Sequence, residues 1–263
     1  MPLQTAYPLV NATPLAGVLP PAYGTSTFAG ALSTAYGNTE FVILNKFGKY
    51  EGITYTQSGN LTYFDSTGTL QTAAVDTMVL DYDPSTLVLR GYPFWEARTN
   101  LLLQSEDFAT TWALAGTGTP SVTVNSATSP AGTLTADKIT GAGTTSNRVQ
   151  QTVTVANSTT YVISFFVKNF DAVTSQFHVA NTSSGTANSE TTINWSGSTI
   201  TGFNNTGTTV GVAVSLPNNW YRVYFAFTTN GSDAGTSTVR FYPNGNGASA
   251  VNMSVYLWGA QLE

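Results

Sequence analysis

The chain has 263 residues, no cysteine and a formal net charge of −5, and only 9% of its residues are charged, against about 25% in an average soluble domain. Its nine Lys and Arg residues are scattered and form no cationic stripe, which argues against binding of nucleic acid or of an anionic membrane surface. No apolar run reaches the roughly 18 residues that span a bilayer. The absence of cysteine excludes thiol catalysis, disulfides and thiolate zinc sites.

Uncharged side chains supply most of the polarity, because the chain contains 44 Thr, 23 Ser and 20 Asn. Its 41% apolar and 12% aromatic residues are enough to form a core. Short runs rich in Thr, Val, Tyr and Phe recur between Gly, Asn and Pro turn signals, whereas helical periodicity is hard to find. The sequence therefore predicts an all-β protein.

Residues 1–40 differ in composition from the rest of the chain. They contain five prolines and many Ala and Gly residues, too few large apolar side chains for a core of their own. Proline has no N–H to donate to a β-ladder, so it is rare in central strands. We expect this segment to form an extended Pro-rich arm that docks against a neighbouring subunit.

Residues 41–97 are expected to form a small β-hairpin module. The segment Asp65–Gly68 fits a β-turn whose glycine adopts the left-handed conformation. The segment Asp83–Thr86 places Pro84 at the first central position of a type I turn. The alternative interpretation is a linker that decorates the larger domain.

Residues 98–263 are expected to form one sandwich. In the segment 161–168, alternation sends Ile163 and Phe165 to one face and Ser164 to the other. The same alternation at 255–259 puts Leu257 and Gly259 on one face. About eight strands are predicted, including 134–140, 149–155, 161–168, 176–180, 220–227, 239–242 and 255–259. Eight antiparallel strands in two sheets describe a jelly roll.

Several motifs carry a resemblance to a known class of protein. They are the stretch RTNLLLQSEDF at 98–108, Trp112, TADK at 135–138, WYR at 220–222 and the ending YLWGAQLE at 256–263. Together with the segments 63–66, 81–84 and 96–100, they resemble a module of tailed-bacteriophage virion surface proteins, and the match covers roughly residues 55–263. The resemblance implies a carbohydrate-binding-module-like jelly roll on the virion surface, of the head-decoration, head-spike or tail-fibre type.

A sugar site needs an exposed aromatic ring to cover a pyranose and amide or carboxylate groups to bind its hydroxyls. Two turn-like stretches offer this combination and are the predicted glycan-binding residues: Trp195 with Asn194, and Tyr242 with Asn244. The family-like motifs also contain residues to which we assign a structural role, with Arg222 expected to stack on a ring or to pair with Asp107 or Glu106. These residues are Arg98, Glu106, Asp107, Trp112, Trp220, Arg222 and Trp258.

Catalysis is not expected. The single histidine, His178, lies in a strand-like setting, and we interpret it as a satisfied or exposed strand residue. No pair of carboxylates recommends itself for glycoside hydrolysis. No cofactor is predicted, although a structural calcium ion held by loop carbonyls with Asp107 or Asp137 is compatible with the sequence.

The leading hypothesis is a non-enzymatic structural protein of a bacteriophage virion, a capsid decoration or head-spike subunit docked by its arm onto the major capsid or tail protein. The alternative is a tail fibre or receptor-binding protein that attaches to host surface polysaccharide, although no coiled-coil heptads are visible. The third is a polysaccharide-degrading spike, which usually needs paired acids. A homo-oligomer such as a trimer fits the symmetry of such sites.

Overall fold

A computed structural model describes residues 14–18, 27–31, 56–57, 59–93, 99–118, 120–142, 146–181, 187–206, 210–229, 235–245 and 252–263. The chain divides into two compact units, residues 1–55 and 56–263. In the first unit, β1 (Pro14–Val18) and β2 (Thr27–Ala31) pair antiparallel, with Pro14 opposite Ala31. The rest of the expected arm and residues 41–55 of the expected hairpin module lie outside the described residues.

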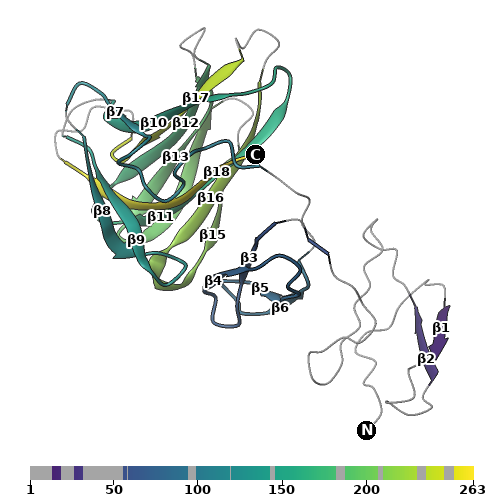
Figure 1. The fold of residues 1–263 in the computed structure, drawn as a ribbon. Helices are drawn as coiled ribbons and strands as arrows, with labels where there is room; N and C mark the ends of the chain where they lie inside the picture. Colours follow the sequence, from purple (N-terminus) through teal and green to yellow (C-terminus); the bar gives the residue numbers. More distant parts are fainter. Residues whose placement is uncertain are drawn as a thin grey trace. The chain divides into compact units, whose positions relative to one another are not determined.

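The second unit contains sixteen strands within the described residues. Two hairpins, β3–β4 and β5–β6, precede two six-stranded sheets with the orders β14-β13-β12-β17-β10-β7 and β15-β16-β11-β18-β9-β8 (Figure 1). All pairings are antiparallel. The strands are β3 (Leu61–Phe64), β4 (Leu70–Ala73), β5 (Asp81–Tyr82), β6 (Leu89–Gly91), β7 (Ala113–Ala115), β8 (Ser121–Thr128), β9 (Leu134–Thr140), β10 (Arg148–Thr154), β11 (Thr160–Asn169), β12 (Thr174–Asn181), β13 (Ala187–Ser196), β14 (Thr199–Thr206), β15 (Val212–Ser215), β16 (Tyr221–Thr228), β17 (Thr236–Tyr242) and β18 (Ser254–Leu262).

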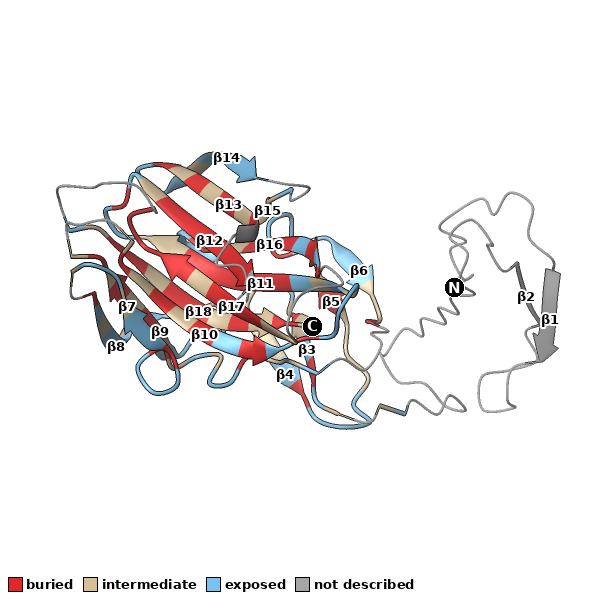
Figure 2. Cartoon of the chain, turned by 90° about the horizontal axis from the view of Figure 1, so that it is seen from above, coloured by how far each residue is buried: buried red, intermediate tan, exposed pale blue. Residues whose placement is uncertain are grey.

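The predicted fold class is confirmed, because the two six-stranded sheets form a jelly-roll sandwich. A 3-10 turn at Pro217–Asn219 interrupts the β-structure, and no described helix is long and apolar enough to cross a membrane. The sandwich has twelve strands in place of the expected eight. Among the missed strands, β8, β14 and β15 are largely exposed, because they lie at sheet edges (Figure 2). β8 and β14 also carry Thr, Ser and Asn residues that resemble loop sequence.

The main core lies between the two sheets and is rich in aromatic rings. Phe165 of β11 stacks on Phe177 of β12 with ring centroids 4.4 Å apart, and Phe177 lies 4.6 Å from Phe241 of β17. All three rings are buried. Offset and tilted aromatic pairs of this kind add to the stabilisation that burial alone provides.

A β-bulge in β18 corrects one predicted alternation. Phe166 pairs with Trp258, but Ser164 pairs with Gln261, so two residues of β18 oppose one residue of β11. Gly259 has a φ of 61°, a left-handed conformation that glycine adopts without strain. The bulge shifts the parity, and Ala260, not Gly259, follows Leu257 into the core.

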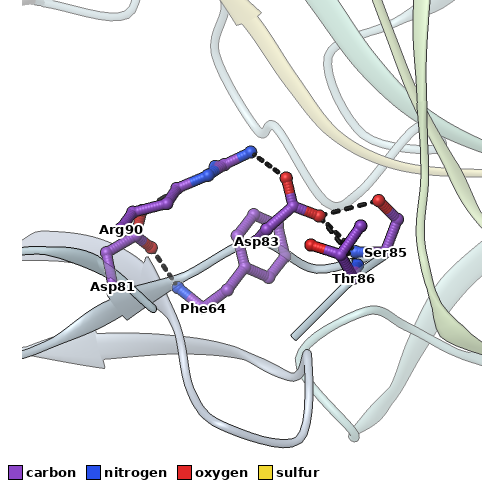
Figure 3. A network of polar contacts seen from close by, with 6 residues as sticks. All are labelled: Phe64, Asp81, Asp83, Ser85, Thr86 and Arg90. Atoms are coloured by element: carbon purple, nitrogen blue, oxygen red, sulfur yellow. Dashed lines mark hydrogen bonds and ion pairs between the residues drawn. The ribbon is translucent and has the colours of Figure 1, made fainter. Parts of the chain in front are cut away.

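The hairpin module turns at both predicted places, but the second turn is closed by a hydrogen bond from the Leu87 N–H to the Asp83 carbonyl and is one residue longer than the predicted type I turn. Gly68 has a φ of 76° and donates its N–H to the carbonyl of Asp65. The Asp83 carboxylate accepts hydrogen bonds from the N–H groups of Ser85 and Thr86 and from the guanidinium of Arg90, at 2.7 to 2.9 Å (Figure 3). The Ser85 hydroxyl also donates to this carboxylate and is the largest cause of its lowered pKa.

The hairpin module packs on the outer surface of the β11-containing sheet. Phe64 of β3 joins Phe166, Trp220 and Trp258 in a second apolar cluster, whose remaining buried members are Ala136 and Leu216. Leu70 of β4 also donates its backbone N–H to the carbonyl of Pro130. Residues on both sides of the expected boundary at 97–98 therefore contribute to one core.

Candidate functional site

The outward surface of the sheet β14-β13-β12-β17-β10-β7 carries a concentration of polar side chains. On its inward side, alternate residues such as Val149, Phe177, Val239 and Phe241 enter the core. Strand alternation places their neighbours on the opposite side. We call this side the polar face; it is formed by Arg148, Gln150, Thr152, Gln176, His178, Glu190, Thr192, Asn194, Asn204, Thr238, Arg240 and Tyr242.

Strand register aligns the central residues of the polar face in rows. Glu190 of β13 is opposite His178 of β12, which is opposite Arg240 of β17. Arg240 is in turn opposite Gln150 of β10, so the row crosses four strands. Gln176 of β12 lies opposite Tyr242 in the neighbouring row. Side chains directly opposite one another on a sheet face are close enough to act on one ligand.

Several polar atoms on this face are buried without a hydrogen-bond partner. They are Oε1 of Gln176, Nε2 of His178 and Nε of Arg240. Gln176 and His178 are only 7% and 5% exposed. Burying a polar atom without a partner costs roughly 1–3 kcal/mol, so such atoms are uncommon in folded proteins and call for an explanation.

His178 is held in its neutral form. Burial is the largest cause that lowers its pKa to about 4, and the positive charges of Arg240 and Arg148 lower it further, whereas Glu190 acts in the opposite direction. The imidazole is stacked on the ring of Tyr242, with centroids 6.0 Å apart. At neutral pH the ring therefore offers hydrogen bonding without adding a charge.

Tyr242 is fixed on the polar face and does not lie in an open loop. The ring is only 2% exposed and lies between His178 and the guanidinium of Arg148, whose Cζ is 5.7 Å from the ring centroid. Asn244 follows in the turn after β17; it is buried, and both its side-chain atoms lack a partner. The turn was predicted, but the aromatic ring has no free face.

Trp195 is buried at the end of β13. It is 7% exposed, its Nε1 donates to Oγ of Ser175 at 3.0 Å, and its ring meets Tyr221 edge-on in the main core. Asn194, its neighbour, lies half-buried on the polar face. The exposed aromatic surface on which both predicted sites were based is absent at Trp195 and Tyr242, and the glycan contact of these residues stays a prediction.

The structure brings together residues that the sequence interpretation missed, namely Gln176, His178 and Arg240 with Gln150 and Glu190. His178 lies in a strand, as interpreted, but it is buried, and only one ring nitrogen is satisfied: Nδ1 lies 3.5 Å from the Tyr242 hydroxyl, whereas Nε2 has no partner. The available signal was the recurrence of long polar side chains at every second position of the predicted strands, as at Gln176 and His178.

The three tryptophans assigned a structural role are buried. The indole N–H groups of Trp112, Trp220 and Trp258 donate to the carbonyls of Gln104 and Thr128 and to the hydroxyl of Thr135, at 3.0 to 3.3 Å.

The charged residues of the same motifs have separate roles. Asp107 stabilises the following turn by accepting from the Ala109 N–H and the Thr110 hydroxyl, and the Thr110 contact is the largest cause of its lowered pKa. Glu106 is exposed, and Arg98 lies outside the described residues. The guanidinium of Arg222 lies over the Phe166 ring, 5.9 Å from its centroid, which fits the predicted stacking on a ring. Arg222 forms no ion pair with Asp107 or Glu106, because the ion pairs within the described residues are those of Arg90.

The polar face is suited to hydrogen bonding of a ligand. The described residues contain no group of three or more His, Asp or Glu side chains that could hold a metal ion. The carboxylate of Asp137, considered above for calcium, accepts from the backbone N–H groups of Phe108 and Asn125 at 2.9 Å.

An open pocket of about 520 Å³ adjoins the polar face and is lined in part by Leu103, Gln150 and Thr152.

No protein-family model matches the chain, and no curated protein matches it. Solved structures with a similar fold include the xylan-binding domain CBM22-1 of Paenibacillus barcinonensis Xyn10C, with 13% identity, a TM-score of 0.40 and coverage of 64% of this chain and 97% of that one. A CBM4 structure has 15% identity, a TM-score of 0.34 and coverage of 49% and 70%.

The enzymatically active domain of tailspike protein 4 from bacteriophage CBA120 is similar at 13% identity and a TM-score of 0.39. The match covers 62% of this chain but 21% of that one. Because all these TM-scores are below 0.5, the jelly-roll assignment rests on the sheet order of the chain itself.

Proposed function

We propose that this chain is a non-enzymatic surface protein of a bacteriophage virion, and that its jelly roll binds a glycan on the polar face. The observation that carries the glycan-binding role is the set of buried polar atoms without partners on Gln176, His178 and Arg240. They lie on the adjacent strands β12 and β17. A bound ligand would give these atoms the hydrogen bonds that the described residues do not provide.

The chemistry of the face suits sugar hydroxyls. A hydroxyl both donates and accepts, and the face offers amides, an imidazole, a guanidinium and threonine hydroxyls within two rows of residues. Fixed groups also reduce the entropy lost on binding. The Gln176 amide is held in place, because its Nε2 donates to the Thr192 hydroxyl, while its buried Oε1 has no hydrogen-bond partner.

The virion location is supported by the sequence motifs at 98–108, 135–138, 220–222 and 256–263, which resemble phage surface proteins. In the leading form of the proposal, the N-terminal arm docks a head decoration or head spike onto the particle. In the alternative form, the chain belongs to a tail fibre and attaches to host surface polysaccharide. Imaging of labelled protein on intact particles distinguishes these two positions.

Glycan-array binding of the whole chain tests the proposed activity. The Gln176→Ala variant should lose most of its binding, because the amide would no longer pair with a sugar hydroxyl. Gln261→Ala is the matched control, since Gln261 is half-buried on the outward side of the other sheet. The absence of binding above background, or an equal loss in both variants, would remove the glycan role.

The docking role of the arm has a separate test. Particles produced with a chain that lacks residues 1–40 should not retain the protein after purification. Retention at the level of the full chain would show that another segment docks it.

A further inference from the structure

The distribution of charge on the polar face identifies a class of glycan, and this step rests on the proposed function. The whole chain has only nine Lys and Arg residues and a net charge of −5. Two of the nine, Arg148 and Arg240, lie on the polar face together with one carboxylate, Glu190. With His178 neutral, the face has a net charge of +1 in an otherwise acidic chain.

On the polar face, Arg240 lacks a counter-ion among the described residues. It lies in β17 near the centre of the sheet, between His178 of β12 and Gln150 of β10, and neither neighbour carries a negative charge at neutral pH. It forms no ion pair within the described part of the chain, and its buried Nε has no hydrogen-bond partner. The Arg240 side chain as a whole is half-buried, and a guanidinium pairs with an anion through charge-assisted hydrogen bonds.

The nearest carboxylate of the row is engaged elsewhere. Glu190 is opposite His178 and two strands away from Arg240, and its Oε1 accepts a hydrogen bond from the Thr206 hydroxyl at 2.8 Å. The buried, neutral His178 therefore separates Glu190 from Arg240 in the row. Because no carboxylate lies opposite Arg240, an anion that pairs with it would have to come from a ligand.

Arg148 provides a second, oriented positive group. Its Nε donates to Oε1 of Gln150 at 2.7 Å and its Nη1 donates to the carbonyl of Ser146 at 3.0 Å. The guanidinium also lies over the ring of Tyr242. These contacts hold the positive charge beside the row that contains Arg240, and none of the contacts of Arg148 within the described residues is with a carboxylate.

We propose that the polar face selects an acidic glycan, and that the Arg240 guanidinium binds a carboxylate of that glycan. The planar fork of arginine matches a carboxylate through two parallel hydrogen bonds, which a hydroxyl cannot reproduce. The amide of Gln176 and the imidazole of His178 then bind hydroxyls of the same or the adjacent sugar. Arg148 adds electrostatic attraction across the face.

Binding to a panel of uronic-acid-containing bacterial polysaccharides tests this inference, with the carboxyl-reduced form of each polysaccharide as the comparison. Reduction converts the carboxylate to a hydroxymethyl group and leaves the backbone linkages unchanged. The whole chain should bind the acidic forms about tenfold more tightly, the effect of losing one charge-assisted hydrogen bond. The difference should decrease as salt is added.

Substitutions at Arg240 test whether this residue causes the preference for acidic glycans. Arg240→Gln should bind acidic and reduced forms about equally, and Arg240→Lys should recover part of the preference because it keeps the charge without the fork. Arg90→Gln is the control, since it removes the same charge from the hairpin module. Circular dichroism and thermal unfolding would identify a variant that fails to fold, and Arg148→Gln then provides a second test of the same preference.

The outcomes separate this inference from the proposed function. Equal binding of acidic and reduced glycans by the unmodified chain, or an unchanged preference in Arg240→Gln, would overturn the acidic selectivity and leave glycan binding in place. Binding to neutral glycans alone would do the same. No binding to any member of the panel or of the neutral array would overturn both.

Discussion

Acidification from pH 7 to pH 5 should destabilise the folded chain through His178. In the unfolded chain this imidazole has an ordinary pKa of 6.5, whereas in the fold its pKa is lowered to about 4, chiefly by burial. Between these values the unfolded state binds more protons than the folded state. Stability therefore decreases as the pH falls from about 6.5 towards 4.

The size of the effect follows from the difference between the two pKa values. A shift of one unit corresponds to about 1.4 kcal/mol, so the whole window is worth about 3 kcal/mol. At pH 5 the folded histidine is still mostly neutral and the unfolded one mostly protonated, which gives a loss of about 2 kcal/mol relative to pH 7. This is a large share of a typical folding free energy of about 5–15 kcal/mol.

Urea unfolding of the chain and of a His178→Gln variant at pH 7, 6 and 5 measures this loss. Glutamine keeps hydrogen-bonding capacity but does not titrate, so the difference between the two pH dependences isolates His178. Asp137 acts in the opposite direction, since burial raises its pKa, but it is present in both proteins. If the two proteins lose stability in parallel from pH 7 to 5, the imidazole is not held neutral by burial, and the interpretation of the polar face is wrong.

Three further predictions concern the framework, each measured by thermal or denaturant unfolding. Asp137→Asn should cost about 2 kcal/mol, because the amide keeps one acceptor and turns its NH₂ towards the Phe108 or Asn125 N–H; an unchanged midpoint would contradict this. Gly259→Ala should cost at least 1 kcal/mol, since φ is 61° and the added methyl would lie 2.8 Å from the Phe166 ring, and a neutral effect would mean that the bulge rearranges. Phe64→Ala should cost about 3 kcal/mol and expose the hairpin module to limited proteolysis, whereas an unaltered midpoint would show that this module does not stabilise the sandwich.

Much of the fold could be predicted from local patterns, because strand faces and turns depend on neighbouring residues. Ile163 and Phe165 alternate into the core as expected, and the turn ending at Gly68 has the predicted left-handed glycine. The site was harder to predict, because it depends on contacts between residues that are distant in the sequence. Trp195 was selected for its turn-like neighbours, and it does lie at the end of a strand. However, its ring packs against Tyr221 of the opposite sheet, and no local sequence pattern predicts that contact.

The sequence by itself determined the chemical character of the protein: an all-β chain, poor in charge, with polar strands rich in Thr, Ser and Asn. Composition is a property of the whole chain and alternation is a local pattern, so both can be identified without knowledge of the fold. Only the tertiary structure decided that Gln176, His178 and Arg240 share one face, because strand register joins β12 to β17, which are about 60 residues apart in the chain. Register depends on the packing of both sheets around Phe165, Phe177 and Phe241, and that packing gives a few scattered polar residues a common surface.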